Sequence, residues 1–307
     1  MSKIYDVLII GSGPAGLAAA IYASRAELDA AVIEKGEMSG GQIVNTYEVD
    51  NYPGIPGISG YDLAVKFREH CDQLNVTFLD DEVKDCDFSE TVKKLKLESG
   101  EVLEAKSVIV AAGAASRKLN VPGEEELSGM GVSYCATCDG AFFRNRITAV
   151  VGGGDAAVED AIFLSRLCKK VYIIHRRDKF RAAKTLVTQL KNRDNIEIIW
   201  NSVVNKIDGN DVVESVNITN VKNGENRNLS VNGVFIAVGY EPETAAYKGQ
   251  VELDQAGYIV AGENCETSMP GVFAAGDIRT KQLKQVITAA ADGANAVTSV
   301  ERYFNSL

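Results

Sequence analysis

The chain has 307 residues, 46% of them hydrophobic and 24% charged, which is typical of a soluble globular protein with about two domains. Its net charge of −10 argues against broad binding to nucleic acids or to anionic membranes. No run reaches the ~18 apolar residues that a membrane helix needs, and no signal-peptide pattern opens the chain. We therefore expect a cytoplasmic protein that has neither nucleic acid nor membrane as a partner.

The first segment predicts a nucleotide-binding unit of strand, helix and strand. Tyr5–Ile10 is an apolar strand, Pro14–Arg25 is a helix rich in small residues, and Ala30–Glu34 is the next strand. The turn between the first two elements carries a G-x-G-x-x-G fingerprint, whose glycines permit a tight turn, backbone approach to a pyrophosphate and close helix packing. The helix N-terminus favours phosphate, and Glu34 stands where an acid accepts hydrogen bonds from a ribose. The residues of the fingerprint are Gly11, Ser12, Gly13, Pro14, Ala15 and Gly16.

A long irregular segment and a series of short strands come next. Residues 36–56 contain Gly40-Gly41-Gln42 and Asn51-Tyr52-Pro53-Gly54, and a loop of this length inside a compact domain is usually functional. An amphipathic helix is expected at Gly60–Leu74, and residues 116–122 are interpreted as a linker. Strands are expected at Val76–Leu79, Val83–Phe88, Val92–Leu97, Val102–Ala105 and Ser107–Ala112.

A pair of cysteines lies between two halves of the chain. Cys135 and Cys138 are followed directly by Asp139; such a pair accepts two electrons as a disulfide and returns them as two thiols. Asp139 either moves protons for this pair or only caps a turn, since Asp-Gly is a common turn pair. A structural zinc site needs four ligands, and with two histidines and no second Cys-x-x-Cys we expect no metal. The remaining cysteines are interpreted as buried small residues, namely Cys71, Cys86, Cys168 and Cys265.

A second strand–helix–strand unit follows, at Ile147–Val151, Asp155–Leu167 and Lys170–His175. Gly152 and His175 are 23 residues apart, as are Gly11 and Glu34, and this repeated register is stronger than either fingerprint alone. The second unit ends in arginines where the first ends in an acid, and arginines suit a 2′-phosphate. We therefore assign FAD to the first unit and NADPH to the second, although a solvated basic face would also account for the arginines. The residues assigned to NADPH are Gly152, Gly153, Gly154, Asp155, Ala156, His175, Arg176, Arg177 and Arg181.

The last third is expected to hold a meander and a long helix. An antiparallel meander is predicted from Ile196–Trp200, Val203–Ile207, Val213–Thr219, Asn228–Val231 and Val234–Val238. Residues 239–242 are interpreted as a second linker. Strands at Tyr258–Val260 and Val272–Ala275 and a helix from about Gln285 to Phe304 complete the chain.

Together these motifs resemble the bacterial low-molecular-weight thioredoxin reductases, of the class II pyridine nucleotide-disulfide oxidoreductase family, over nearly the whole chain. The matching stretches are 11–16, 40–42, 135–140, 175–182 and 271–277, and a dithiol inside the NADPH domain marks the low-molecular-weight type. The resemblance implies an α/β fold of two Rossmann-like dinucleotide-binding domains of the three-layer ββα type. The FAD-binding domain would comprise 1–117 and 243–307, with the NADPH-binding domain, 118–242, inserted. The protein would be a homodimer.

The resemblance also implies the reaction of a thioredoxin-disulfide reductase, EC 1.8.1.9. NADPH would reduce FAD, FAD the disulfide, and the dithiol oxidised thioredoxin, with domain rotation between the half-reactions. Cys138 would face the flavin, Cys135 would attack thioredoxin and Asp139 would be the acid/base. NADPH contacts are further implied at Val238 and Gly239. Other FAD contacts are implied at Lys35, Gly36, Gly40, Gly41, Gln42, Asn51, Val83, Ala112, Gly113, Gly276, Asp277, Lys284, Gln285 and Val286.

Three residues depart from the pattern of the family. Gly113 follows Ala-Ala where Ala-Thr is common, Lys284 stands where arginine is usual, and Glu34 replaces a residue that is neutral in some members.

Three other functions are to be considered. The electron donor could be ferredoxin, but ferredoxin-linked relatives typically lose the second fingerprint and its arginines. The acceptor could be another thioredoxin-like or peroxiredoxin-reducing protein. A non-catalytic redox sensor is the remaining alternative, and no appended binding segment supports it.

Overall fold

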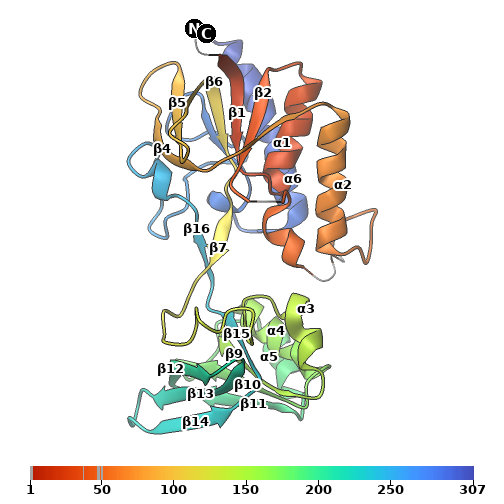
Figure 1. The fold of residues 1–307 in the computed structure, drawn as a ribbon, viewed down its shortest axis with the longest axis vertical. Coiled ribbons are helices and arrows are strands. Elements are labelled where there is room, and N and C mark those ends of the chain that lie inside the picture. The colour runs from red at the N-terminus through yellow and green to blue at the C-terminus, as the bar shows by residue number, and fades with distance from the viewer. Residues whose placement is uncertain (1–2, 37, 47–48, 50) are drawn as a thin grey trace. The chain divides into compact units, whose positions relative to one another are not determined.

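The chain forms two compact units in a computed structural model, one inserted into the other (Figure 1). Unit 1 comprises Met1–Ala115 and Glu241–Leu307, and unit 2 comprises Ser116–Tyr240. The structure describes all residues except 1–2, 37, 47–48 and 50, and it describes Asn45 and Cys138 without their side chains. The two crossings of the chain lie in the strands β7 (Ala114–Ser116) and β16 (Tyr240–Pro242), which pair with each other.

Unit 1 is built on a seven-stranded sheet of order β3-β2-β1-β6-β5-β4, in which β17 also pairs with β6. The strands β1, β2, β3, β6 and β17 are parallel to one another, whereas β5 pairs antiparallel with β6 and β4 antiparallel with β5. The elements are β1 (Ile4–Ile10), α1 (Pro14–Arg25), β2 (Ala30–Glu34), η1 (Gly41–Asn45), α2 (Gly60–Gln73), β3 (Thr77–Asp80), β4 (Val83–Asp87), β5 (Lys93–Leu97), β6 (Val102–Val110), η3 (Ala245–Tyr247), β17 (Val272–Ala274), η4 (Gly276–Ile278) and α6 (Val286–Phe304).

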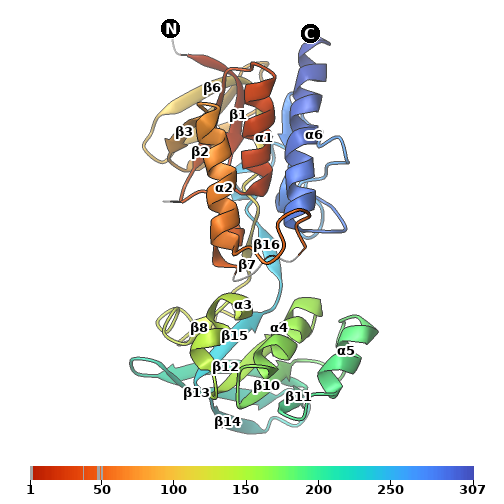
Figure 2. The same ribbon diagram turned by 90° about the vertical axis from the view of Figure 1, so that its right-hand side faces the viewer.

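The central strand β1 is buried on both faces, which explains its unbroken apolar run. Val7 and Ile9 pack into a core shared with residues of α1, α2 and α6, and Figure 2 shows these three helices along one face of the sheet. Leu8 and Ile10 point the other way, into a core with residues of β4, β5 and the segment 247–261. The carboxyl end of this parallel sheet, where β1 meets α1, carries the first glycine turn.

Unit 2 repeats this arrangement around a five-stranded parallel sheet of order β11-β10-β9-β15-β8. Val150 of β9 faces a core with α4 and α5, while Ala149 and Val151 face a core with the antiparallel sheet β12-β13-β14. Each unit is thus an α/β fold with a ββα layering. The elements are β8 (Val132–Ser133), α3 (Ala136–Asp139), η2 (Gly140–Phe143), β9 (Ile147–Gly152), α4 (Asp155–Ser165), β10 (Lys170–His175), α5 (Lys184–Lys191), β11 (Ile196–Trp200), β12 (Ser202–Gly209), β13 (Val213–Asn220), β14 (Asn226–Ser230) and β15 (Gly233–Ala237).

The predicted five-stranded antiparallel meander is wrong at both ends. Only β12, β13 and β14 form it; β11 is parallel to β10, and β15 is parallel to β9 and β8. Helix α5, which was not predicted from the sequence, supplies the crossover that a parallel pairing of β10 with β11 requires. In β15, Val234, Phe235 and Ile236 are all buried, as expected of a central parallel strand and not of an alternating meander strand.

Two further expectations are corrected. The strands predicted at Val102–Ala105 and Ser107–Ala112 are one strand, β6, because Lys106 stays exposed within it and pairs with Asp6 at 2.8 Å. The supposed linker 116–122 lies entirely within unit 2, and Leu119 and Val121 pack against the core of that unit.

Candidate active site

The first glycine turn has the geometry of a pyrophosphate cradle. Gly11 has φ +98°, and a Cβ added at Gly16 would lie 1.8 Å from the Gly11 carbonyl oxygen, so neither position accepts a side chain. A Cβ at Gly13 would meet nothing within 4 Å. Gly13 is the N-cap of α1 and provides no side-chain cap for the first N–H groups, with Pro14 in the first turn. An open glycine before uncapped helix N–H groups fits a phosphate.

Glu34 lies at the end of β2, beside this turn. Its Oε2 accepts hydrogen bonds from the N–H and Oγ of Ser12, at 2.7 and 2.6 Å, and its Oε1 accepts the N–H of Gly36 at 2.8 Å. Carboxylate oxygens carry two lone pairs each, so this half-buried acid can still accept a ribose hydroxyl. The adjacent Lys35 pairs with Glu243 at 2.6 Å.

The glycine-rich segment after β2 lies on the same turn. Gly40 donates its N–H to the carbonyl of Ser12 at 2.7 Å, and a Cβ on Gly41 would lie 3.2 Å from the Cα of Gly13. Gln42 is exposed in η1. Further along, Asn51 donates its side-chain N–H to the Oε1 of Gln285 at 2.7 Å, which joins the loop to the start of α6.

A second stretch of unit 1 reaches this region from the C-terminal part of the chain. Gly276 has φ +81°, and a Cβ there would lie 2.9 Å from the Cβ of Ala15. Asp277 has a buried Oδ1 without a hydrogen-bond partner among the described residues, and burial raises the pKa of this carboxyl. Lys284 donates to the Asp277 carbonyl at 2.9 Å. A buried acceptor next to Gly276, which itself approaches Ala15, fits the hydroxyl groups of a dinucleotide.

The remaining residues predicted to contact FAD lie at the ends of elements of unit 1. Val83 is buried at the start of β4, and Val286 begins α6. Ala112 and Gly113 follow β6, and the Gly113 carbonyl accepts the N–H of Glu243 at 3.1 Å.

A buried ion cluster that the sequence analysis missed supports the Gly276 turn. Asp292 of α6 accepts Arg279 through both oxygens, at 2.8 and 2.6 Å, and also accepts Lys281 at 2.8 Å and the N–H of Gly276 at 2.9 Å. Arg279 and Asp292 are 7% and 4% exposed. Their spacing of thirteen residues matches no helical period, so no local pattern in the sequence signals the pair.

The second glycine turn, in unit 2, repeats the first with one change. Gly152 has φ +157°, and a Cβ there would lie 2.2 Å from the carbonyl oxygen of Ala237, whereas Gly154 faces open space. Gly153 is covered by the ring of His175, 2.2 Å from an added Cβ. Helix α4 begins at Asp155 without a side-chain cap from Gly154, and Ala156 is exposed in its first turn.

Three arginines project from the segment that follows β10. Arg176, Arg177 and Arg181 are exposed, and no carboxylate of the described residues forms an ion pair with them; the neighbouring acids pair with Lys170, Lys222 and Arg227 instead. Of the other predicted NADPH residues, Val238 is half-buried and the Gly239 carbonyl accepts the N–H of Arg117 at 2.9 Å.

The segment with Cys135 and Cys138, which includes the short helix α3, packs against helix α4, the helix that begins at the second glycine turn. Cys135 is half-buried and disulfide-bonded, with its Sγ 3.4 Å from Thr137 Oγ1; the side chain of Cys138 lies outside the described part of the structure. Gly140, directly after Asp139, approaches Leu164 and Phe163 of α4 so closely that a Cβ would lie 3.0 Å from each. Helix α4 therefore begins at the second glycine turn and also packs against the segment that contains the redox cysteines.

The other four cysteines are free and buried, as expected. Burial raises the pKa of the Cys71, Cys86 and Cys265 thiols to about 12, so these side chains remain protonated and unreactive at neutral pH. Cys168 is shifted in the same direction by burial.

Phe142 is a surface feature that the sequence analysis missed. Its side chain is 75% exposed, and it lies in η2, four residues after Cys138. Aromatic residues, Phe among them, are enriched in protein–protein interfaces.

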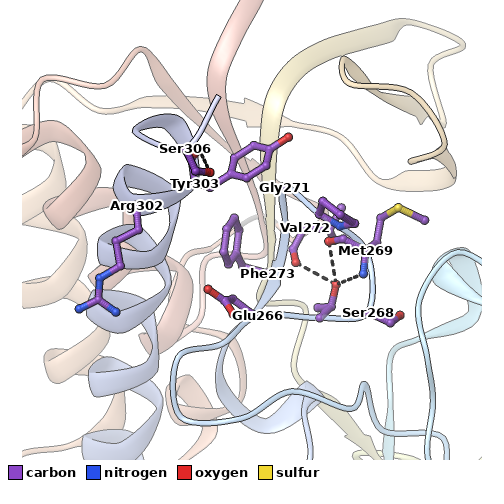
Figure 3. A pocket seen from close by; sticks show the side chains of 11 residues that line it. Glu266, Ser268, Met269, Gly271, Val272, Phe273, Arg302, Tyr303 and Ser306 are labelled. Carbon is purple, nitrogen blue, oxygen red and sulfur yellow. Dashed lines mark hydrogen bonds between the residues drawn. The ribbon is translucent and has the colours of Figure 1, made fainter.

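Two other observations concern the described part of the chain. A cavity of about 340 Å³ lies where the end of α6 meets the segment Glu266–Phe273 (Figure 3), and none of the predicted site residues lines it. Within the described residues no set of three or more His, Cys, Asp or Glu is placed to hold a metal ion, and no helix there is long and apolar enough to cross a membrane.

Two dinucleotide turns and a disulfide-bonded cysteine define the class of protein, and comparison with known proteins agrees. The family model of the pyridine nucleotide-disulphide oxidoreductases matches residues 5–293. Among curated proteins, the thioredoxin reductase of Peptoclostridium acidaminophilum is 46% identical, covering 99% of this chain and 98% of that protein. The thioredoxin reductase of Bacillus subtilis is 43% identical, covering 99% and 96%.

The solved structures give the same result. The crystal structure of Lactococcus lactis thioredoxin reductase in its FR conformation has a TM-score of 0.87 and 42% identity, covering 99% of this chain and 100% of that one. The chain belongs to the pyridine nucleotide-disulphide oxidoreductase family and, within it, to the thioredoxin reductases.

Proposed function

We propose that this chain is a cytoplasmic, homodimeric thioredoxin-disulfide reductase that binds FAD at the first glycine turn and NADPH at the second. The observation that supports this most is the chemical difference between two otherwise matching turns. The first is flanked by the carboxylates of Glu34 and Asp277, which suit hydroxyl groups. The second is flanked by three exposed arginines that form no ion pair with a described carboxylate, and these suit a 2′-phosphate.

FAD, when bound, would accept a hydride from NADPH and supply the electron pair that opens the disulfide of Cys135. In the outward half-reaction the Cys135 thiolate attacks the thioredoxin disulfide and forms a mixed disulfide. The Cys138 thiolate then attacks the Cys135 sulfur, which releases reduced thioredoxin and restores the enzyme disulfide. Asp139, one residue beyond, would give and take the thiol protons. Unit 2 would rotate between the half-reactions at the chain crossings 115–116 and 240–241.

The arginines provide a test of the electron donor. Replacing Arg176, Arg177 and Arg181 together by alanine is expected to lower kcat/KM for NADPH by about 10²–10³-fold, since each charge-assisted hydrogen bond contributes about 1.5–3 kcal/mol at most and the three are not additive. The kcat/KM for NADH should change less than threefold. Steady-state kinetics with both nucleotides measures this, and Lys191→Ala on the nearby helix α5 is the control. An equal loss for NADH, or none for NADPH, would refute a 2′-phosphate site.

The two open glycines allow the cofactor sites to be tested one at a time. Gly13 and Gly154 both have extended backbones, with φ −70° and −93°, and open space at their Cβ positions. Gly13→Val is therefore expected to fold but to lose FAD, and Gly154→Val to keep FAD but to lose NADPH binding, because the side chain would occupy the place of the pyrophosphate. Flavin absorbance of the purified variants and NADPH calorimetry measure the two effects. Loss of FAD from Gly154→Val would reverse the assignment.

A reductase of another thioredoxin-like protein would use the same chemistry. Reduced ferredoxin as the donor is disfavoured because the second glycine turn is formed and the arginines beside it remain exposed. Purified protein tested with NADPH against thioredoxin and other disulfide proteins discriminates these functions by rate.

A further inference from the structure

The segment that carries the three arginines, residues 176–183, is tied back to the glycine turn by its own backbone. The N–H of Arg181 donates to the carbonyl of Gly153 at 2.8 Å, and the N–H of Asn201 donates to the carbonyl of Arg177 at 3.2 Å. Asp178 pairs with Lys222 at 3.1 Å on the outer side. The basic segment is thus attached to two neighbouring parts of unit 2.

The side chain of Asp155 forms a hydrogen bond with the C-terminal end of this segment. Its Oδ1 accepts the N–H of Ala183 at 2.7 Å. Asp155 is the first residue of α4 and Ala183 is the N-cap of α5, so one carboxylate connects the starts of two helices. An acid beside a phosphate site would repel the ligand, and here the carboxylate instead accepts a backbone donor. The Asp155 carboxylate thus holds Ala183 in place, and its negative charge argues against a direct contact with a phosphate.

His175 ties the middle of the segment in a similar way. Its side chain is 6% exposed, its ring covers Gly153, and its Nε2 lies 3.1 Å from the carbonyl oxygen of Lys179. Burial, and then the charges of Arg176 and Arg177, lower its pKa below the usual 6.5. The ring is consequently neutral at pH 7, and its Nε2–H donates to Lys179.

Aromatic rings pack together at the segment 176–183. The ring of Phe180 lies 5.6 Å from that of His175 and 4.5 Å from that of Trp200. Trp200 is the only tryptophan of the chain, so its emission reports on this place alone.

We infer that Asp155 and His175 are positioning residues that keep the segment 176–183 in its phosphate-binding form before the nucleotide arrives. This inference rests on the proposed function, since it takes the 2′-phosphate of NADPH as the ligand. A segment that is already ordered loses less conformational entropy on binding, and affinity gains accordingly. The effect should be larger for a ligand that carries the 2′-phosphate, because the exposed arginines of the segment, Arg176, Arg177 and Arg181, suit that group.

The test is calorimetric titration of the FAD-loaded full-length protein with 2′,5′-ADP, NADPH and NADH. Asp155→Ala is expected to raise the Kd for 2′,5′-ADP about tenfold and to leave the Kd for NADH within about threefold. Asp155→Asn keeps an oxygen acceptor and should bind as tightly as the wild type. His175→Phe keeps a ring against Gly153 without the donor and should weaken 2′,5′-ADP about fivefold. Glu159→Ala, an exposed change on the same helix, is the control.

The outcomes separate this inference from the proposed function. Wild-type affinity for 2′,5′-ADP in Asp155→Ala would overturn the positioning role alone, and so would a loss of NADH affinity equal to that of 2′,5′-ADP, which marks general damage to the site. Failure of the wild type to bind 2′,5′-ADP would overturn the NADPH assignment itself. The Trp200 emission of free Asp155→Ala should differ from that of the free wild type, and identical spectra together with unchanged affinity would exclude a loosened segment.

Discussion

Replacing Cys135 by serine is expected to lower thioredoxin reduction by more than about 10³-fold, because a hydroxyl neither forms a disulfide nor acts as a thiolate nucleophile. Cys135 is disulfide-bonded and lies half-buried directly before α3. NADPH-dependent bleaching of the flavin should persist in the variant, since both nucleotide turns are unchanged. Cys138→Ser should have the same two effects.

The measurement is a coupled assay of NADPH oxidation with thioredoxin, run beside an anaerobic flavin reduction. Cys168→Ala is the matched control, because Cys168 is a free, buried cysteine of the same unit and its loss should leave turnover within about twofold. Thioredoxin reduction by Cys135→Ser at near wild-type rate would show that the dithiol turn is not the electron outlet.

Asp292→Ala is expected to lower the free energy of unfolding by about 3–5 kcal/mol, because it leaves Arg279 and Lys281 buried without a counter-charge. The Gly276 N–H would also lose its acceptor, so the turn that carries Asp277 should loosen and flavin should dissociate more readily. Chemical denaturation of the apoprotein and a fluorescence titration with FAD measure the two effects. Glu301→Ala, an exposed change on the same helix, should cost less than about 0.5 kcal/mol. Equal costs for the two variants would contradict a supporting role for the cluster.

The same carboxylate predicts how stability depends on pH. Burial acts against ionisation of Asp292, but hydrogen bonds from Arg279, Lys281 and Gly276 outweigh it and hold its pKa below the usual 3.8. Because the pKa of Asp292 is lower in the folded than in the unfolded state, its stabilising effect is fully present above the unfolded-state pKa. The effect is lost as the pH falls through the folded-state pKa. The wild type should therefore lose stability below about pH 4, and Asp292→Asn should show a shallower decline there.

Local sequence patterns were sufficient for the nucleotide turns. The spacing of the fingerprint predicts Gly11, Gly16 and Gly152, and of these the Gly16–Gly11 contact is local, whereas Gly11 also packs against Ala111 and Gly152 against Ala237. The family resemblance added Asp277 and Gln285, which no short-range pattern assigns. The structure places Asp277 with Gly276 beside the first glycine turn, and Gln285 against Asn51.

Long-range pairing was not predictable in the same way. The interpretation of β11 and β15 as meander strands failed because strand direction depends on crossovers such as α5, whose Lys184–Lys191 sequence has a single fully buried residue, Leu190. The Arg279–Asp292 pair depends on how η4 packs against α6. The exposure of Phe142 depends on the turn of η2, since an aromatic residue in a sequence is more often buried.

The most direct test of the proposed relay is an anaerobic absorbance titration of the flavin, first with NADPH and then with oxidised thioredoxin. NADPH at low concentration should bleach the flavin band, and thioredoxin should restore it, which would require both nucleotide sites and the Cys135 disulfide to work in sequence. Bleaching by reduced ferredoxin but not by NADPH would contradict the donor site at the arginines. Bleaching by NADPH without recovery on adding thioredoxin would contradict thioredoxin as the acceptor.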